Sequence, residues 1–317
     1  MRRFRPSILR LVAPLLVLLS IPALPITAAF AQAPASALTG SPEVKNLFWQ
    51  PNQIQQGSPA FFTLELSGPA ARVTATWIGK QVTFFKSDKP HVWYALAGAD
   101  LETQAGDHEL RITAVMAGGH TAHAAESIAV GAANFGTGTA NVAEQYVQPN
   151  AEEQKVIERD EVLKKHAYAQ DVRRPLWSGN FIKPVAAEST PSFGETRLLN
   201  EEKTSRHTGT DFPVKEGSPV HVSNSGVVLL ARDLYYEGNC VIVDHGDRLF
   251  TVYMHLSKMN VHPGEHLRKG GLIGLSGATG RVTGPHFHMG VRWNGAWLDP
   301  VQLLGLTLPD RTRAGKK

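Results

Sequence analysis

Histidine and aspartate side chains recur in the C-terminal part of this 317-residue chain at spacings that could bind a metal ion and move protons. Eight of the 13 histidines lie between residues 207 and 288. His207 and Asp211 are four residues apart, and residues at this spacing lie on one side of a helix or a strand. Gly209 and Pro213 disfavour a helix. We therefore expect a shaped loop or strand edge on which an imidazole and a carboxylate converge.

A second pattern is His286-Phe287-His288. Alternate side chains of a strand share a face, so both imidazoles would point into one cleft while Phe287 packs behind them. Two neutral imidazoles and a carboxylate form a ligand set that suits Zn²⁺ and leaves a fourth position for water. The alternative is a strand that carries surface histidines.

A third pattern, Tyr253-Met254-His255-Leu256, indicates a strand that ends in histidine. Alone, such a histidine usually belongs to a packed core. Together the three patterns supply four histidines and one aspartate, which is more than one tetrahedral metal ion needs. Because a catalytic zinc site typically uses three protein ligands, the further histidines can handle protons.

Residues from about 193 to 303 resemble peptidase family M23, the LytM/lysostaphin-type zinc endopeptidases of bacterial cell walls. The matching segments are His207 to Asp211, Tyr253 to Leu256, the glycine-rich segment 274–280, Gly284 to His288, and Asp299-Pro300. The resemblance covers about a third of the chain, and the combination in this order is highly specific. The preceding β-rich part resembles the N-terminal portion of some M23 proteins more loosely.

The resemblance implies that His207, Asp211 and His288 bind one Zn²⁺ per chain, and that His255 and His286 form the unligated catalytic pair. It implies a zinc metallo-endopeptidase that hydrolyses peptide stems or cross-bridges of bacterial peptidoglycan. The alternative is a catalytically weak wall-binding or amidase-activating M23-like module, since some family members have lost their ligands. A zinc peptidase acting on protein or glycine-rich substrates would use the same residues.

Four further histidines of this region match no ligand position of the family, and we expect them at the surface or around the ligands. They are His221, His245, His262 and His266.

The surrounding sequence predicts a mainly β protein. Short runs rich in β-branched and aromatic residues, such as 61–66 and 72–77, alternate with turn signals and predict an immunoglobulin-like β-sandwich over residues 42–130. A linker over 131–185 follows, and then the M23 peptidase domain over 186–305. The strands of that domain are short and closely spaced, which favours antiparallel pairing, because parallel crossovers need a dozen or more residues. Residues 306–317 indicate a polar tail.

The linker contains one predicted helix, over about 151–168. Asn150 and Glu153 have the spacing of a capping box at its start. Its apolar side would carry Val156, Ile157, Val162 and Leu163, and its charged residues would form a solvated face. We expect a loop where Gly136-Thr137-Gly138-Thr139 precedes this helix.

The first 31 residues predict a secretory signal peptide, because four arginines precede an apolar run and small residues follow at cleavage spacing. An uncleaved membrane anchor is the alternative. After this segment 32 − 4 = 28 basic residues face 28 acidic ones, which excludes a polyanion binder that relies on a basic footprint. We expect an exported protein, periplasmic or extracellular at the cell wall, without a stable membrane anchor. The lone Cys240 precludes an internal disulfide and is expected to be buried.

Overall fold

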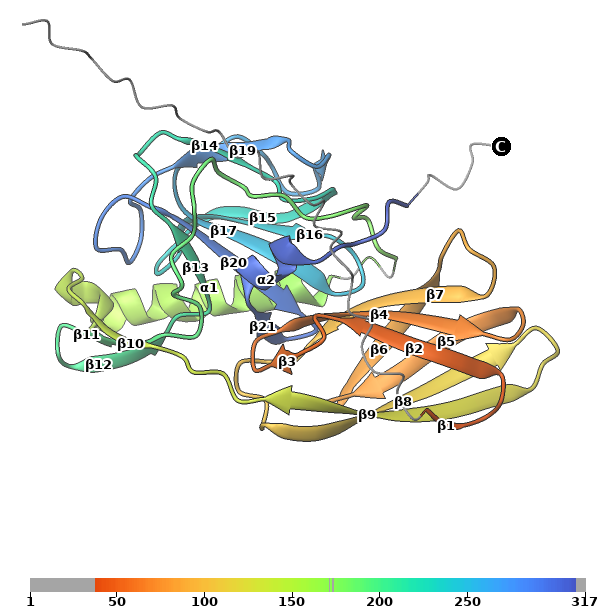
Figure 1. The fold of residues 1–317 in the computed structure, drawn as a ribbon. Coiled ribbons are helices and arrows are strands. Elements are labelled where there is room, and N and C mark those ends of the chain that lie inside the picture. The colour runs from red at the N-terminus through yellow and green to blue at the C-terminus, as the bar shows by residue number, and fades with distance from the viewer. Residues whose placement is uncertain (1–37, 171, 173, 312–317) are drawn as a thin grey trace, which may run out of the picture. The chain divides into compact units, whose positions relative to one another are not determined.

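The computed structural model describes residues 38–311 apart from residues 171 and 173. The predicted signal peptide, residues 1–31, lies outside the described residues, as does the end of the predicted tail after residue 311. Strands dominate the described chain (Figure 1), which confirms the predicted mainly β class. None of the described helices is long and apolar enough to cross a membrane.

The first nine strands build a β-rich unit whose two sheets share one strand. They are β1 (Thr39–Gly40), β2 (Val44–Gln50), β3 (Ile54–Gln55), β4 (Pro59–Leu66), β5 (Ala70–Trp77), β6 (Lys80–Lys86), β7 (Val92–Gly98), β8 (Gly106–Met116) and β9 (Thr121–Gly131). The order is β1-β9-β8-β5-β6-β7-β4-β2, and β3 pairs with β9. Strand β6 pairs with β5 along its length and with β7 at its end.

Inward-facing side chains of these strands form an apolar core that includes Phe62, Leu64 and Trp77. The predicted strands 61–66 and 72–77 lie within β4 and β5. Strand β9 was not predicted, because the first three of its five inward positions carry Ala122, Ala124 and Glu126, which have low β-propensity.

The next segment contributes a small sheet that the sequence did not predict. This segment comprises β10 (Thr137–Ala140), the 3₁₀ helix η1 (Glu144–Tyr146), helix α1 (Ala151–Ala169), β11 (Thr196–Leu199) and β12 (Lys203–Arg206), and the three strands form the sheet. Strand β10 pairs in parallel with β11, and β11 pairs antiparallel with β12. The predicted loop at residues 136–139 is therefore wrong. A four-residue strand with two glycines has little local signal, and it forms because a distant strand supplies its hydrogen bonds.

The C-terminal sheet is antiparallel throughout, as predicted. Its elements are β13 (Gly209–Phe212), β14 (Pro219–His221), β15 (Gly226–Leu234), β16 (Gly238–Asp244), β17 (Leu249–Met259), β18 (His266–Leu267), β19 (Leu272–Ser276), β20 (Phe287–Trp293), β21 (Ala296–Leu298) and helix α2 (Pro300–Gly305). The order is β13-β20-β17-β16-β15-β18, with β21 on β20 and with β19 joining β14 to β17. Buried β17 is central, and Cys240 on β16 is fully buried, as predicted.

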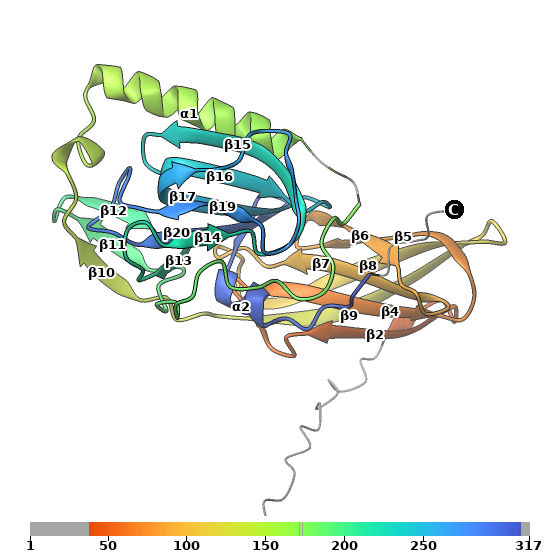
Figure 2. The ribbon, with the colours of Figure 1, turned by 90° about the horizontal axis from the view of Figure 1, so that it is seen from above.

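Helix α1 begins with the predicted capping box. Asn150 Oδ1 accepts hydrogen bonds from the backbone N–H groups of Glu152 and Glu153, and the Glu153 carboxylate accepts one from the Asn150 N–H. The helix contacts β15, and Figure 2 shows it running along that side of the sheet. The prediction for its apolar side is wrong at Val162, whose exposed fraction is 66%. Asp160 is buried instead, because its carboxylate accepts the Tyr235 N–H at 2.7 Å.

Side chains from the predicted linker and tail also belong to the core. Trp177 is buried, with its ring centroid 5.5 Å from that of Phe85 and 6.3 Å from that of Phe61. Leu306 and Leu308 are buried as well, although they lie in the predicted polar tail. Composition could not reveal this, since the packing partners are distant in sequence.

Candidate active site

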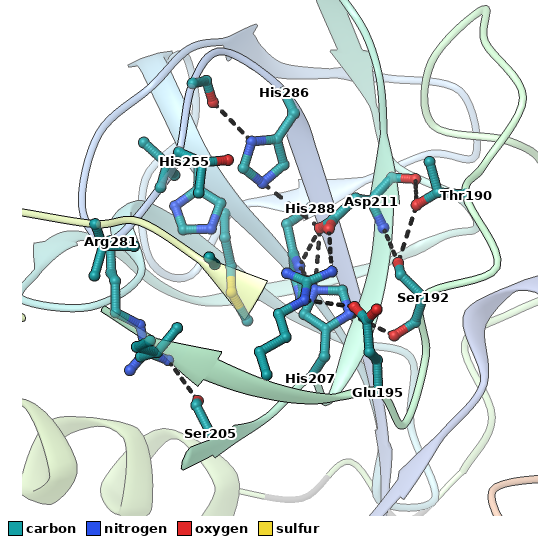
Figure 3. A pocket seen from close by; sticks show the side chains of 18 of the residues that line it. Thr190, Ser192, Glu195, Ser205, His207, Asp211, His255, Arg281, His286 and His288 are labelled. Atoms are coloured by element: carbon teal, nitrogen blue, oxygen red, sulfur yellow. Dashed lines mark hydrogen bonds and ion pairs between the residues drawn. The ribbon is translucent and has the colours of Figure 1, made fainter. Parts of the chain in front are cut away.

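Three predicted ligand residues converge on one point in the structure. Asp211 on β13 lies directly opposite His288 on β20, and His207 precedes β13. His288 Nδ1 lies 2.8 Å and His207 Nε2 3.1 Å from Asp211 Oδ1, and the two imidazole nitrogens are 3.0 Å apart. These three residues form a group that could hold a metal ion. Figure 3 shows the three side chains pointing toward one another.

Gly209 makes the close approach of His288 possible. A Cβ atom at this position would lie 2.3 Å from His288 Nε2 and 2.3 Å from the Met289 carbonyl oxygen. Both distances are far below van der Waals contact. The glycine between His207 and Asp211 is therefore needed to leave room for the third imidazole.

A backbone carbonyl fixes the tautomer of His207. Its Nδ1 lies 2.8 Å from the Ser192 carbonyl oxygen, which can only accept a hydrogen bond, so Nδ1 carries the proton. The Nε2 lone pair then faces the Asp211 carboxylate and His288. Imidazole nitrogen and carboxylate oxygen are preferred Zn²⁺ ligands, and ligating histidines usually donate their other N–H in this way. The residues present therefore fit a zinc ion.

Arg197 on β11 fixes the other oxygen of the Asp211 carboxylate. Its Nη2 donates to Asp211 Oδ2 at 2.9 Å, while its Nε donates to Glu195 Oε2 at 2.7 Å. Burial raises the pKa of Asp211, but its close contacts with the His207 and His288 imidazoles outweigh burial and hold this pKa well below its usual range. Asp211 is thus ionised and oriented at neutral pH. Sequence reasoning missed both Arg197 and Ser192.

His255 is aimed into the site by a bulge in β17. Three residues of β16, from Asn239 to Val241, lie opposite four residues of β17, from Tyr253 to Leu256. His255 adopts a φ of 59°, which is rare for a residue with a side chain. Bulges redirect side chains next to active sites. The sequence predicted a strand that ends at His255, and this is wrong, because β17 continues to Met259.

Two backbone carbonyls orient His255 and His286 alike. His255 Nδ1 donates to the Thr279 carbonyl at 2.8 Å, and His286 Nδ1 donates to the Gly284 carbonyl at 2.9 Å. Both Nε2 atoms therefore carry a lone pair. His286 Nε2 lies 3.5 Å from Asp211 Oδ1, and the two ring centroids are 5.0 Å apart. Burial lowers the pKa of His255 to about 3, which leaves this imidazole neutral at neutral pH.

The five predicted site residues line one cleft of about 700 Å³. His286 lies just before β20, and Phe287 is fully buried behind it. The remaining walls come from β10 to β12, from the segment 281–285, and from Tyr236 and Glu237. None of these wall residues was predicted as a site residue from the sequence, because they carry no ligand or catalytic spacing pattern of their own.

The remaining histidines of the region lie outside this cleft. His262 and His266 are exposed and His221 is half-buried, whereas His245 is fully buried. The His245 imidazole lies 2.8 Å from the Ser225 carbonyl and 2.7 Å from Thr251 Oγ1. The expectation of a surface position, or of one around the ligands, is therefore wrong for His245, which is a core residue with satisfied nitrogens.

Comparisons with known proteins agree with this site. The sequence profile of peptidase family M23 matches residues 205–300. The peptidoglycan DD-endopeptidase ShyA of Vibrio cholerae is 41% identical over 116 residues, which are 37% of this chain and 26% of ShyA. The DD-carboxypeptidase/endopeptidase Mpg of Neisseria meningitidis is 39% identical over 110 residues, 35% of this chain and 25% of Mpg. The chain thus spans about a quarter of the length of these curated relatives.

A solved structure extends the likeness beyond the matched segment. A Pseudomonas aeruginosa crystal structure described as an M23 peptidase superposes with a TM-score of 0.60 at 29% identity, covering 80% of this chain and 96% of that one. The antiparallel sheet and its His–Asp–His cluster lie within the residues that match the family profile. The chain carries a domain of peptidase family M23.

Proposed function

We propose that this chain is a zinc metallo-endopeptidase that hydrolyses peptide cross-links of bacterial peptidoglycan. The observation that carries the proposal is the convergence of His207, Asp211 and His288 within 3.1 Å, beside two imidazoles with free Nε2 atoms. The three would hold one Zn²⁺, and His255 and His286 would be the catalytic pair. The similarity to ShyA, a peptidoglycan DD-endopeptidase, and to Mpg, a DD-carboxypeptidase/endopeptidase, supports the substrate class.

The protein groups of the cleft can supply the proton transfers that hydrolysis requires. When bound, a zinc ion lowers the pKa of water to about 7 and polarises a carbonyl group. A neutral imidazole at His255 or His286 can accept the proton of the attacking water through Nε2. The other imidazole can stabilise the developing oxyanion or protonate the leaving amine. The carbonyls of Thr279 and Gly284 hold both rings ready for these roles.

We further propose that the enzyme works outside the cytoplasm, in the periplasm or at the cell wall, after removal of residues 1–31 as a signal peptide. The apolar run behind four arginines supports this placement. We propose a division of the remaining chain into a β-sandwich over 42–130, a linker over 131–185 and a peptidase domain over 186–305.

The test uses the chain from Ala33 onward, loaded with zinc and incubated with cross-linked muropeptides. We expect hydrolysis products by mass spectrometry, loss of hydrolysis on chelation, and recovery when zinc is returned. His288→Ala should lose both zinc and activity, while the exposed His262→Ala serves as the matched histidine control. Full activity in His288→Ala would overturn the ligand assignment.

Two further measurements separate the competing functions. Elemental analysis should find one zinc ion per chain; folded protein that binds peptidoglycan without stoichiometric zinc would instead be a wall-binding or amidase-activating module. A panel that includes protein and glycine-rich peptides should show preference for muropeptides. Preference for those other substrates would reject peptidoglycan as the substrate class.

A further inference from the structure

Arg281 is a cation in the wall of the cleft that has no carboxylate partner among the residues that the structure describes. Neighbouring carboxylates are already paired with other cations: Arg197 binds Glu195 and Asp211, and Glu237 binds Lys164 at 2.5 Å. Arg281 is half-buried and borders the same cavity as the five site residues. Burial lowers the pKa of Arg281, yet a guanidinium stays charged in proteins. A buried charge of this kind is costly unless a counter-charge binds it.

The guanidinium of Arg281 is held in place with most of its donors free. Its Nη2 donates to Ser205 Oγ at 3.1 Å, and its Cζ lies 4.7 Å from the centre of the Tyr236 ring. An arginine offers five N–H donors, and Ser205 is the only side-chain acceptor that Arg281 has within the described residues. Lys203 Nζ, 5.9 Å from the same ring centre, adds a second positive charge.

The segment that carries Arg281 is fixed relative to the candidate catalytic histidines. The Arg281 N–H donates to the Tyr236 carbonyl at 2.9 Å. Thr279 and Gly284, on either side of Arg281, supply the carbonyls that orient His255 and His286. In the view of Figure 3, Arg281 and Ser205 lie on one side of the cleft and Asp211 on the other. A group bound by Arg281 would therefore keep a set position relative to both imidazoles.

We propose that Arg281, with the Tyr236 ring and Ser205, forms a subsite for a free carboxylate of the substrate peptide. This inference rests on the proposed peptidase function, because it concerns what the same cleft accepts. A guanidinium fork matches a carboxylate with two parallel hydrogen bonds, and an aromatic ring beneath it preserves its plane. The carboxylate comes either from the C-terminus of the peptide or from one of its side chains.

The test uses the zinc-loaded chain and three substrates that differ only in their carboxylates. They are a cross-linked muropeptide, the same molecule amidated at its terminal carboxylate, and the same molecule amidated at its side-chain carboxylate. For the wild-type chain we expect amidation of one of these two carboxylates, terminal or side-chain, to lower kcat/KM by about 10- to 100-fold, the typical effect of losing a charge-assisted hydrogen bond. The amidation that causes the loss identifies the carboxylate. Equal rates on all three substrates would overturn the subsite.

Variants of Arg281 complete the test. Arg281→Gln should lower kcat/KM on the unmodified muropeptide by the same factor. It should leave kcat/KM unchanged on the amidated substrate that the wild-type chain cleaves slowly. The kcat/KM of Arg281→Lys on the unmodified muropeptide should lie between those of the wild-type chain and Arg281→Gln. Arg232→Gln, an exposed position on β15, is the matched control. If Arg281→Gln slows all substrates equally at unchanged zinc content, Arg281 only supports the fold. If the zinc-loaded wild-type chain cleaves none of the three substrates, the proposed peptidase function is wrong, and so is the subsite proposal that rests on it.

Discussion

Replacement of Gly209 by alanine tests whether close packing between β13 and β20 creates the metal site. The added methyl group would lie 2.3 Å from both His288 Nε2 and the Met289 carbonyl oxygen, whereas ordinary contacts of a Cβ atom begin at 3.4 Å. The difference, 3.4 − 2.3, is about 1 Å. The carbonyl cannot rotate away, since it belongs to the backbone of β20. The strand pair must separate, or the imidazole must leave its place.

Both consequences have an expected size. Overpacking of this kind costs about 1–3 kcal/mol of unfolding free energy. A displacement of about 1 Å in a reacting site can reduce the rate by about 100-fold. We therefore expect Gly209→Ala to lower kcat/KM on muropeptides by about that factor and to weaken zinc binding.

Three measurements check this prediction: urea unfolding in the presence of chelator, zinc affinity by competition with a chromophoric chelator, and muropeptide hydrolysis. Gly305→Ala is the control, because a Cβ atom there meets nothing within 4 Å and the backbone is not left-handed. We expect this control to match the wild-type chain in all three. If Gly209→Ala binds zinc with wild-type affinity and unfolds at the same urea concentration, the steric reasoning is refuted.

Three further predictions concern other parts of the molecule. Arg197→Gln should weaken zinc binding by about 10- to 100-fold in chelator competition, because it frees the outer oxygen of Asp211; unchanged affinity would show that Asp211 needs no such support. Burial lowers the pKa of His245 to about 4 from an ordinary 6.5, so the folded state binds fewer protons and its stability should fall by up to about 3 kcal/mol as the pH drops from 6.5 to 4. Urea unfolding across this range should show a shallower pH dependence in His245→Gln, and identical curves would contradict a neutral buried imidazole. Asn150→Ala should lower the unfolding free energy, measured by urea unfolding, by about 1 kcal/mol through loss of the cap of α1, and an unchanged value would show that the cap does not stabilise the fold.

The local patterns of the site were predictable because each depends on one strand. His286 and His288 alternate along the chain, and His207 and Asp211 are one short loop apart, so their side chains could be expected to share a face. What places the two patterns together is the register that puts Asp211 opposite His288. No property of either segment alone determines that pairing. It was accessible only through resemblance to a family in which the combination recurs.

The groups that orient the site were not predictable, since most are backbone carbonyls. The carbonyls of Ser192, Thr279 and Gly284 each fix a tautomer, and a carbonyl has the same chemistry at every residue type. The left-handed φ of His255 likewise has no signature, because a histidine there breaks the usual preference for glycine. Strain of this kind persists where the surrounding structure imposes it, which is typical of functional sites.

The proposed boundary at residue 186 follows local composition, and contacts of the folded chain cross it. A division there separates β10 from β11, although the two strands pair over four residues and β11 carries the Arg197 that binds Asp211. It also separates α1 from β15, and Trp177 from the core it completes. The segment predicted as a linker thus stabilises one wall of the cleft through β10. Its sequence lacks the marks of a catalytic domain because its contribution is backbone hydrogen bonding and packing, which many sequences can provide.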